Sequence, residues 1–156
     1  LSQALTDFNA MRAREGAKLA DDVRAKAGTI ASLVTQVEQR SPETVAAYRE
    51  KLRQRMEEVL ENTQIDESRI LTEAALFADK VAVDEETVRL RSHLAQLEEM
   101  LQAEGPIGRK LDFLIQEFNR EANTIGSKCS DVALSRVVVD LKGEIEKIRE
   151  QVQNIE

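Results

Sequence analysis

The sequence predicts an all-α protein, an elongated helical hairpin or bundle of about six helices that ends in a coiled-coil-like helix and is oligomeric. Three observations predict this class. The 156 residues include only 6 Gly and 2 Pro, so long stretches contain no helix breaker. Apolar residues recur at spacings of three and four along most of the chain. No stretch shows the two-residue alternation of a half-buried strand, which argues against a sheet.

Two helices are expected in the first part of the chain. The first runs from about Leu1 to Gln39, where the apolar spacings are mostly three, four or sums of these. Ser41 and Pro42 then predict a new helix start, because Ser is a good N-cap and Pro fits the first helical position. The second helix accordingly runs from Pro42 to about Glu61.

The next three helices are bounded by caps and turns. They are expected at residues 67–81, 85–104 and 107–126. Asp66 and Asp84 precede the first two, and Asp is a preferred N-cap residue. Gly105-Pro106 predicts the turn between the second and the third. Gly126 is expected to end the third as its C-cap, because Gly adopts the required backbone conformation without strain.

The last helix, from Ser130 to the end of the chain, has the clearest pattern. Its apolar residues alternate spacings of four and three over three heptads: Leu134, Val138, Leu141, Ile145, Ile148, Val152 and Ile155. A repeat of 3.5 residues favours the side-chain packing of bundles and coiled coils.

The domain organisation follows from these elements. We expect residues 1–156 to form one helical domain, with 1–82 as a long helical arm and 83–156 as the helices that carry the polar motifs. Such an arm exposes apolar stripes unless partners cover them, so we expect a homo-oligomer. The chain begins at Leu1 rather than Met and is already in a helical pattern. We therefore expect that a segment upstream of Leu1 is missing.

Composition and charge exclude several classes of protein. With 22 basic and 29 acidic residues the net charge is −7, which argues against a generically basic nucleic-acid binder. Aromatic residues make up 3% of the chain, so base stacking is not expected as the main binding mode. No apolar run approaches the ~18 residues that cross a bilayer. The lone Cys129 cannot form an internal disulfide, which favours a reducing, cytoplasmic location.

Two polar stripes follow the helix expected at 107–126. One consists of residues at offsets of four, three and four: Asp112, Gln116, Asn119 and Asn123. The other has the same offsets on the adjacent face: Glu117, Glu121, Thr124 and Lys128. Asn and Thr are poor helix formers, and Glu117 and Glu121 are like charges one turn apart. Such conflicts with helix stability are expected at functional sites.

These stripes have the chemistry of a metal and phosphate site. Two carboxylates one turn apart can bind a hard divalent cation, or one can act as a base, and Asn carbonyls add neutral oxygen ligands. Four basic side chains in this segment can hold phosphate oxygens: Arg109, Lys110, Arg120 and Lys128. The alternative is an ordinary solvated helix face in which Arg120 pairs with Glu117 and Glu121.

His93 is the one histidine of the chain. Its unperturbed pKa suits acid–base chemistry near neutrality. Glu86 lies seven residues earlier and shares its face. Because the helices on either side of Gly105-Pro106 must lie side by side, His93 and Glu86 can approach Glu117 and Glu121. The alternative is a surface or interface histidine among charged neighbours.

The segments GRKLDFLIQEFNREANTIGSKCSD and VVVDLKGEIEKIREQVQNIE closely resemble the C-terminal end of the bacterial YicC/YloC endoribonuclease family. The segment from Asp84 to His93 is also similar to that family, and the stretch from Met11 to Gly16 matches more weakly. The resemblance covers most of the chain and is strongest from about Glu73 onward. One departure is Ala82, where family members often have Asp.

The resemblance implies a metal-dependent ribonuclease that cuts single-stranded RNA and assembles as a ring-like hexamer, with a further N-terminal domain. On this basis Glu117 and Glu121 are metal ligands or base, and Asn119 and Asn123 are supporting ligands. His93 is a candidate acid or base. Arg120 and Lys128 hold phosphate. Mg²⁺ or Mn²⁺ is the expected cofactor, and the nucleophile is either water or the 2′-hydroxyl of the RNA.

Two other functions remain open from sequence. The heptads and the acidic charge also fit a helical oligomerisation or interaction module that has no chemistry of its own. A regulatory adaptor that presents RNA or a partner nuclease is the third hypothesis.

Overall fold

The computed structural model describes residues 2–60, 64–103 and 107–153. Within these ranges the chain forms five α-helices and no strand. They are α1 (Ser2–Leu60), α2 (Glu67–Val81), α3 (Asp84–Gln102), α4 (Gly108–Lys128) and α5 (Val132–Gln153). α1 has 59 residues and is therefore about 88 Å long at ~1.5 Å per residue. The all-helical prediction is confirmed for the described residues.

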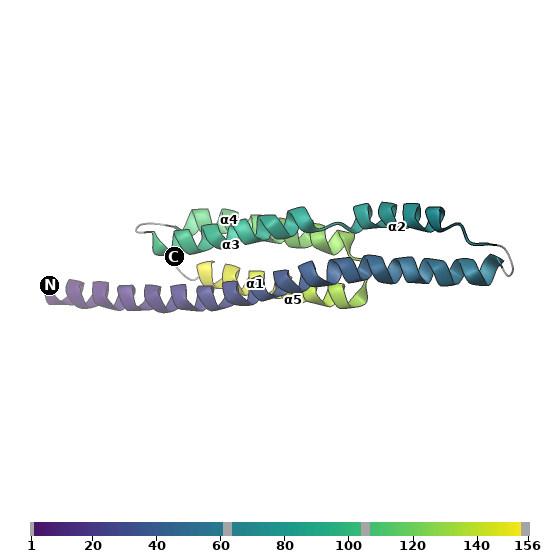
Figure 1. Cartoon of the computed structure of the whole chain (residues 1–156). Coiled ribbons are helices and arrows are strands. Elements are labelled where there is room, and N and C mark those ends of the chain that lie inside the picture. The colour runs from purple at the N-terminus through teal and green to yellow at the C-terminus, as the bar shows by residue number, and fades with distance from the viewer. Residues whose placement is uncertain (1, 61–63, 104–106, 154–156) are drawn as a thin grey trace.

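Four helices enclose one hydrophobic core. α1 packs against α3 and α5, and α4 packs against the same two helices, so α1, α3, α4 and α5 form a four-helix bundle (Figure 1). From α1 this core takes only residues between Val23 and Val37. The six heptad residues of α5 that the structure describes are all buried in it, which confirms the predicted 3.5-residue packing: Leu134, Val138, Leu141, Ile145, Ile148 and Val152.

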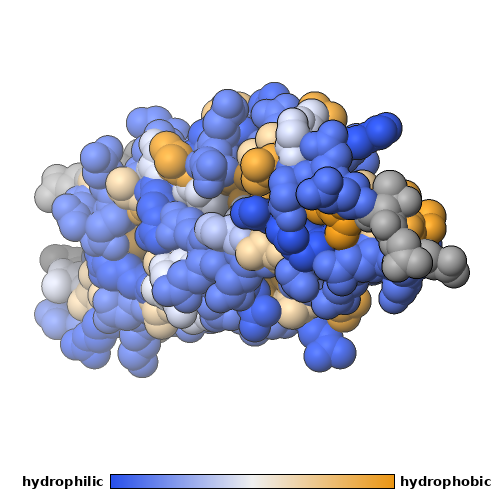
Figure 2. All heavy atoms as spheres, turned by 45° about the vertical axis from the view of Figure 1, so that its right-hand side comes forward, coloured by the Kyte–Doolittle hydropathy of each residue, from blue (hydrophilic) through white to orange (hydrophobic). Residues whose placement is uncertain are grey.

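α1 extends beyond the bundle at both ends (Figure 1). Its C-terminal part pairs with α2, where the rings of Tyr48 and Phe77 stack with centroids 3.9 Å apart. Arg53 donates to Glu67 in the same hairpin at 3.0 Å. At the other end, residues 3–18 are exposed. On the face drawn in Figure 2 the surface is mostly hydrophilic, with apolar residues scattered among polar ones, as expected for a chain that is 33% charged.

The predicted break at Ser41-Pro42 is wrong, because α1 continues through Pro42. A proline inside a helix removes one backbone hydrogen bond and crowds the preceding turn, at a cost of about 3 kcal/mol. Packing on both sides offsets this cost. Val37, one turn before the proline, is fully buried in the bundle core, and Tyr48, less than two turns after it, stacks on Phe77. The expected six helices are therefore five in the described residues, since the first two are one.

The other helix ends agree with the sequence to within a few residues. α2 spans the predicted range, and the Asp66 carboxylate accepts the backbone N–H of Ser68 as its N-cap. Asp84 is not a cap but the first residue of α3. α5 begins at Val132 rather than Ser130, and the Asp131 carboxylate accepts the N–H groups of the first turn.

Gly126 does not end its helix, as had been predicted, since α4 continues to Lys128. A Cβ at position 126 would lie 3.3 Å from a methyl carbon of Val138, which is a tight contact. The glycine is thus explained by the close approach of α4 to α5. Five predictions lie outside the described residues: the helix start at Leu1, the helix ends at Glu61 and Glu104, the turn at Gly105-Pro106 and the heptad position Ile155.

No helix in the described part of the chain is both long enough and apolar enough to cross a membrane. The division of the chain into an arm at 1–82 and motif-bearing helices at 83–156 stays a prediction.

Replacing Pro42 with Ala should raise the free energy of unfolding by about 1–3 kcal/mol, because the missing hydrogen bond of the helix is restored. Urea denaturation followed by circular dichroism measures this change. Glu43→Ala is the control, since Glu43 is exposed in the same turn and its loss should change stability by less than about 0.5 kcal/mol. A Pro42→Ala variant no more stable than the parent would contradict the view that packing forces the helix through Pro42.

Candidate functional site

The candidate site lies where α3 and α4 pack side by side. The two helices contact each other through buried apolar residues, including Leu90 and Phe118. Polar residues border this apolar contact. His93 lies three residues after Leu90 on α3, and Glu117 and Glu121 flank Phe118 on α4. Their positions at the helix interface follow from helical periodicity, since residues three and four apart share a face.

His93, Glu117 and Glu121 form a cluster of candidate metal ligands. One ligand atom from each side chain lies within 4.8 Å of those of the other two. Glu121 is buried, whereas His93 and Glu117 are half-buried. The structure therefore brings together three of the residues that the sequence marked for chemistry, as the short connection between the two helices predicts.

The His93 ring has no hydrogen-bond partner for either nitrogen, although both nitrogens are buried. Its ring packs edge-on to Phe118, with centroids 5.6 Å apart. An unsatisfied buried polar atom costs about 1–3 kcal/mol, so a structure that keeps one needs an explanation. A ligand that contacts the imidazole nitrogen would satisfy it, and the adjacent carboxylates favour a cation as that ligand.

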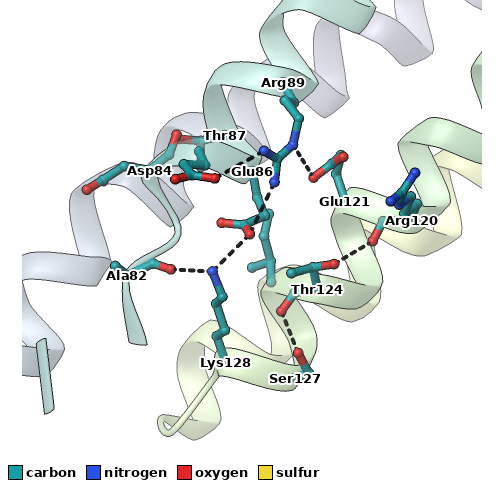
Figure 3. Close-up of polar contacts among 12 residues, drawn as sticks. Ala82, Asp84, Glu86, Thr87, Arg89, Arg120, Glu121, Thr124, Ser127 and Lys128 are labelled. Carbon is teal, nitrogen blue, oxygen red and sulfur yellow. Dashed lines mark hydrogen bonds and ion pairs between the residues drawn. The ribbon is translucent and has the colours of Figure 1, made fainter. Parts of the chain in front are cut away.

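A second buried carboxylate, Glu86, lies next to the cluster and is neutralised by two basic residues. Lys128 Nζ on α4 donates to Glu86 Oε1 at 2.9 Å and to the carbonyl oxygen of Ala82 at 2.8 Å (Figure 3). Arg89 donates to the same Glu86 oxygen at 3.3 Å. Burial alone would raise the pKa of Glu86, but the Lys128 hydrogen bond and the two positive charges outweigh it and keep that pKa below its usual range.

Arg89 connects Glu86 to the cluster. Its Nε atom lies 2.8 Å from Glu121 Oε2, and another of its nitrogens contacts Glu86 at 3.3 Å (Figure 3). The remaining nitrogen contacts Glu85, also at 3.3 Å. Arg89 is a site residue that the sequence alone does not predict. The signal was present in the spacing, because Arg89 lies four residues before His93 and therefore on the same face of α3.

The amide stripe does not join this cluster. Asn119 lies two residues from Glu117, about 200° around the helix, and Asn123 stands in the same relation to Glu121. Both amides face α5, where they line a groove of about 650 Å³ together with Arg149 and other polar residues of α4 and α5: Asp112, Gln116, Arg120, Thr124 and Gln153. The two polar stripes therefore flank the apolar face of α4 on opposite borders, and the expected ligand set of Glu117, Asn119, Glu121 and Asn123 is not assembled.

The four basic residues predicted to hold phosphate have different surroundings. Arg120 is 74% exposed and lies 3.7 Å from Glu117, next to the cluster. Arg109 and Lys110 are exposed in the first turn of α4, about two turns away from Glu117. Lys128 is the ionic partner of the buried Glu86 and is therefore already committed to a structural contact.

Position 82, where related proteins were expected to have Asp, adjoins the Glu86–Lys128 pair. Ala82 offers only its carbonyl oxygen to Lys128, so this chain has no side-chain donor or acceptor there. Cys129 is not activated as a nucleophile. Burial, followed by the charge of Asp131, raises the pKa of its thiol, which donates to the carbonyl oxygen of Ile125 at 3.2 Å.

Comparison with known proteins agrees with the resemblance seen in the sequence. Residues 37–156 match the family described as endoribonuclease YicC-like, C-terminal. A protein named probable endoribonuclease YicC from Clostridioides difficile (strain 630) is 46% identical over 157 residues, which cover all of this chain and 54% of that relative. One of the same name from Haemophilus influenzae (strain ATCC 51907 / DSM 11121 / KW20 / Rd) is 41% identical over 152 residues, or 97% of this chain and 52% of the relative. The chain thus spans about half the length of these curated relatives.

Replacing Lys128 with Met should lower the free energy of unfolding at pH 7 by about 2–3 kcal/mol. Removing one partner of a fully buried pair costs about 3–5 kcal/mol, but Lys128 is 32% exposed and Arg89 remains near Glu86. Glu86 stabilises the parent above its ordinary pKa of 4.5, and this contribution is lost as the pH falls through its lowered pKa in the folded state. The difference between parent and variant should therefore shrink below about pH 4.5.

Urea denaturation between pH 3 and pH 7 measures this difference. Lys147→Met is the control, because Lys147 pairs with Glu144 on the surface of α5 and its loss should change stability by less than about 1 kcal/mol. If Lys128→Met lowers the free energy of unfolding by the same amount at every pH in this range, Glu86 is not the cause of the loss.

Proposed function

The chain belongs to the YicC-like endoribonuclease family, and on that premise we propose that it supplies the metal-binding site of an endoribonuclease that hydrolyses phosphodiester bonds in single-stranded RNA. The observation that carries this proposal is the cluster of His93, Glu117 and Glu121, in which both imidazole nitrogens are buried without a partner. A histidine that is only structural would be expected to hydrogen-bond at one nitrogen at least.

The donor set fits a divalent transition metal. Two carboxylate oxygens and one imidazole nitrogen suit Mn²⁺, which accepts both donor types, better than Mg²⁺, which prefers an all-oxygen set. Three protein ligands also leave positions for water and for a phosphate oxygen. A bound metal would neutralise charge on the reacting phosphate and lower the pKa of a coordinated water.

The two carboxylates differ in exposure, and this suggests different roles. The Glu121 side chain is 6% exposed, so it fits a permanent ligand held inside the α3–α4 interface. The Glu117 side chain is 26% exposed and lies at the rim beside Arg120. We assign Glu117 as the ligand that faces the substrate, with its second carboxylate oxygen accepting the proton of the attacking oxygen. We assign His93 as a metal ligand through the ring nitrogen that lies nearest to the two glutamates.

The substrate contacts follow from the exposed basic residues. Arg120 is the residue we assign to the phosphate next to the bond that is cut, because its side chain is 74% exposed beside Glu117. Arg109 and Lys110 extend a basic edge along α4, and we assign them to phosphates farther along the strand. Asn119 and Asn123 are not part of the proposed metal site, because they face the groove towards α5.

Replacing Glu117 or Glu121 with Gln should reduce cleavage of single-stranded RNA by at least about 100-fold, since each substitution removes a metal ligand or the base. The reaction should require added Mn²⁺ or Mg²⁺ and stop with EDTA. The measurement is the initial rate of cleavage of a fluorescent RNA oligonucleotide, on this chain and on a protein of the full length of its relatives. Glu146→Gln on α5 is the control, because Glu146 is exposed, pairs with Arg149 and is not a member of the cluster.

Undiminished cleavage by both Gln variants would remove the cluster from the mechanism. A full-length protein that binds RNA with a steep salt dependence but never cuts it, with either metal, would favour the regulatory adaptor instead.

A second function, self-association, is supported by the N-terminal part of α1. Leu5, Phe8 and Met11 are 58%, 51% and 50% exposed and follow each other at spacings of three, so they form an apolar stripe on the projecting helix. Contiguous exposed apolar residues of this kind favour a protein–protein contact. We propose that this stripe joins copies of the chain in a homo-oligomer, with a hexamer as the expected assembly of the full-length protein.

Replacing Leu5, Phe8 and Met11 together with Gln should shift the assembly towards smaller species, because the apolar contact surface is removed. Size-exclusion chromatography with light scattering measures the mass over a range of protein concentrations. Val59→Gln is the control, since Val59 is 74% exposed near the other end of α1 and lies outside the stripe. A triple variant with the same mass as the parent at every concentration would contradict an assembly through α1.

A further inference from the structure

We propose that Arg89 occupies the place of the cation at Glu121 when no metal is bound, so that metal binding and the Arg89–Glu121 ion pair exclude each other. This inference rests on the proposed metal site. It adds that the Arg89 guanidinium and the metal ion replace each other beside Glu121. It rests on the contacts of Arg89 itself, which the sequence did not single out.

The contact between Arg89 and Glu121 is the shortest that the guanidinium makes. Arg89 Nε lies 2.8 Å from Glu121 Oε2, whereas its contacts to Glu85 and Glu86 are 3.3 Å long. Glu121 is almost fully buried, and a buried carboxylate needs a counter-charge to stay ionised. Arg89 is the one basic residue for which the described part of the chain gives an ion pair with Glu121. It therefore supplies the positive charge beside this buried carboxylate, where a bound metal would place its own.

A divalent cation held by Glu121 and by its neighbours His93 and Glu117 would lie close to the guanidinium. The ligand atoms of the three side chains lie within 4.8 Å of one another, and Arg89 Nε is 2.8 Å from one Glu121 oxygen. A positive charge at such a distance repels the cation in a partly desolvated site. If both cations lay beside Glu121, their mutual repulsion would oppose the binding of each.

The Arg89 side chain can also move away from Glu121 and still keep ionic partners. Its side chain is 44% exposed, and Glu85, an exposed residue one turn earlier on the same helix, already contacts its Nη1 atom at 3.3 Å. Glu86 contacts the Nη2 atom of Arg89 and is itself paired with Lys128. A rotation of the Arg89 side chain therefore frees Glu121 while two carboxylates retain the guanidinium at the rim of the site.

The exchange predicts that Arg89→Met binds Mn²⁺ more tightly than the parent chain. We expect the Kd for Mn²⁺ to fall at least about fivefold, which is the lower end of ordinary coupling between two sites. Isothermal titration calorimetry with MnCl₂ at pH 7 and fixed ionic strength measures it on the 156-residue chain. Arg91→Met is the matched control: Arg91 is on the same helix but pairs with Glu38 of α1, so its loss should leave the Kd unchanged.

A second measurement tests the same exchange through stability. Without metal, Arg89→Met should have a lower thermal midpoint than the parent, because Glu121 loses its counter-charge. Saturating Mn²⁺ should raise the midpoint of Arg89→Met more than that of the parent. If Arg89→Met does not fold without metal, Arg89→Gln, which keeps a hydrogen-bond donor but no charge, takes its place.

Three outcomes separate this inference from the function on which it rests. Tighter Mn²⁺ binding by Arg89→Met, lost again when Glu121→Gln is added, supports the exchange. Unchanged or weaker binding by Arg89→Met, with Glu121→Gln still abolishing it, overturns the exchange and leaves the metal site standing. If the parent and Arg89→Met both fail to bind millimolar Mn²⁺, the metal site and the exchange fall together.

Discussion

The structure depends on the neutralisation of two carboxylates, Glu86 and Glu121, in the interface between α3 and α4. Each is less than 5% exposed, so each must be paired for the interface to form with both ionised. Lys128 pairs with Glu86 from α4, and Arg89 pairs with Glu121 from α3, so the two ion pairs cross the interface in opposite directions. These crossed pairs connect α3 and α4 alongside the apolar contacts of the core. They also hold Glu121 beside His93 and Glu117.

Local patterns in the sequence are sufficient to predict most of the helices. The heptads of α5 give a buried seam, and the Asp66 cap gives the start of α2, because both depend on residues within a few turns of each other. The approach of His93 to the two glutamates is also predictable, since a short connection constrains two consecutive helices to lie side by side. Such predictions succeed where chain connectivity limits the arrangement.

Two of the errors involve contacts between segments far apart in the chain. Pro42 is carried through α1 by packing on both sides of it, and Gly126 is needed for its distance to Val138 rather than for its backbone conformation. The offsets within each polar stripe do not show that Asn119 lies about 200° around α4 from Glu117. Which border of α4 meets α3 and which meets α5 is set by the bundle, and no local pattern contains that information.

Helix-destabilising residues alone are weak evidence for a catalytic site. Glu117 and Glu121 repel each other one turn apart in the isolated helix, but in the folded chain Arg120 contacts one and Arg89 the other, so the conflict is already relieved by ordinary ion pairs. What ion pairing leaves unexplained is His93, whose two nitrogens remain unsatisfied beside those carboxylates. The case for a metal therefore rests on the histidine, because it is the one member of the cluster whose needs the described residues do not meet.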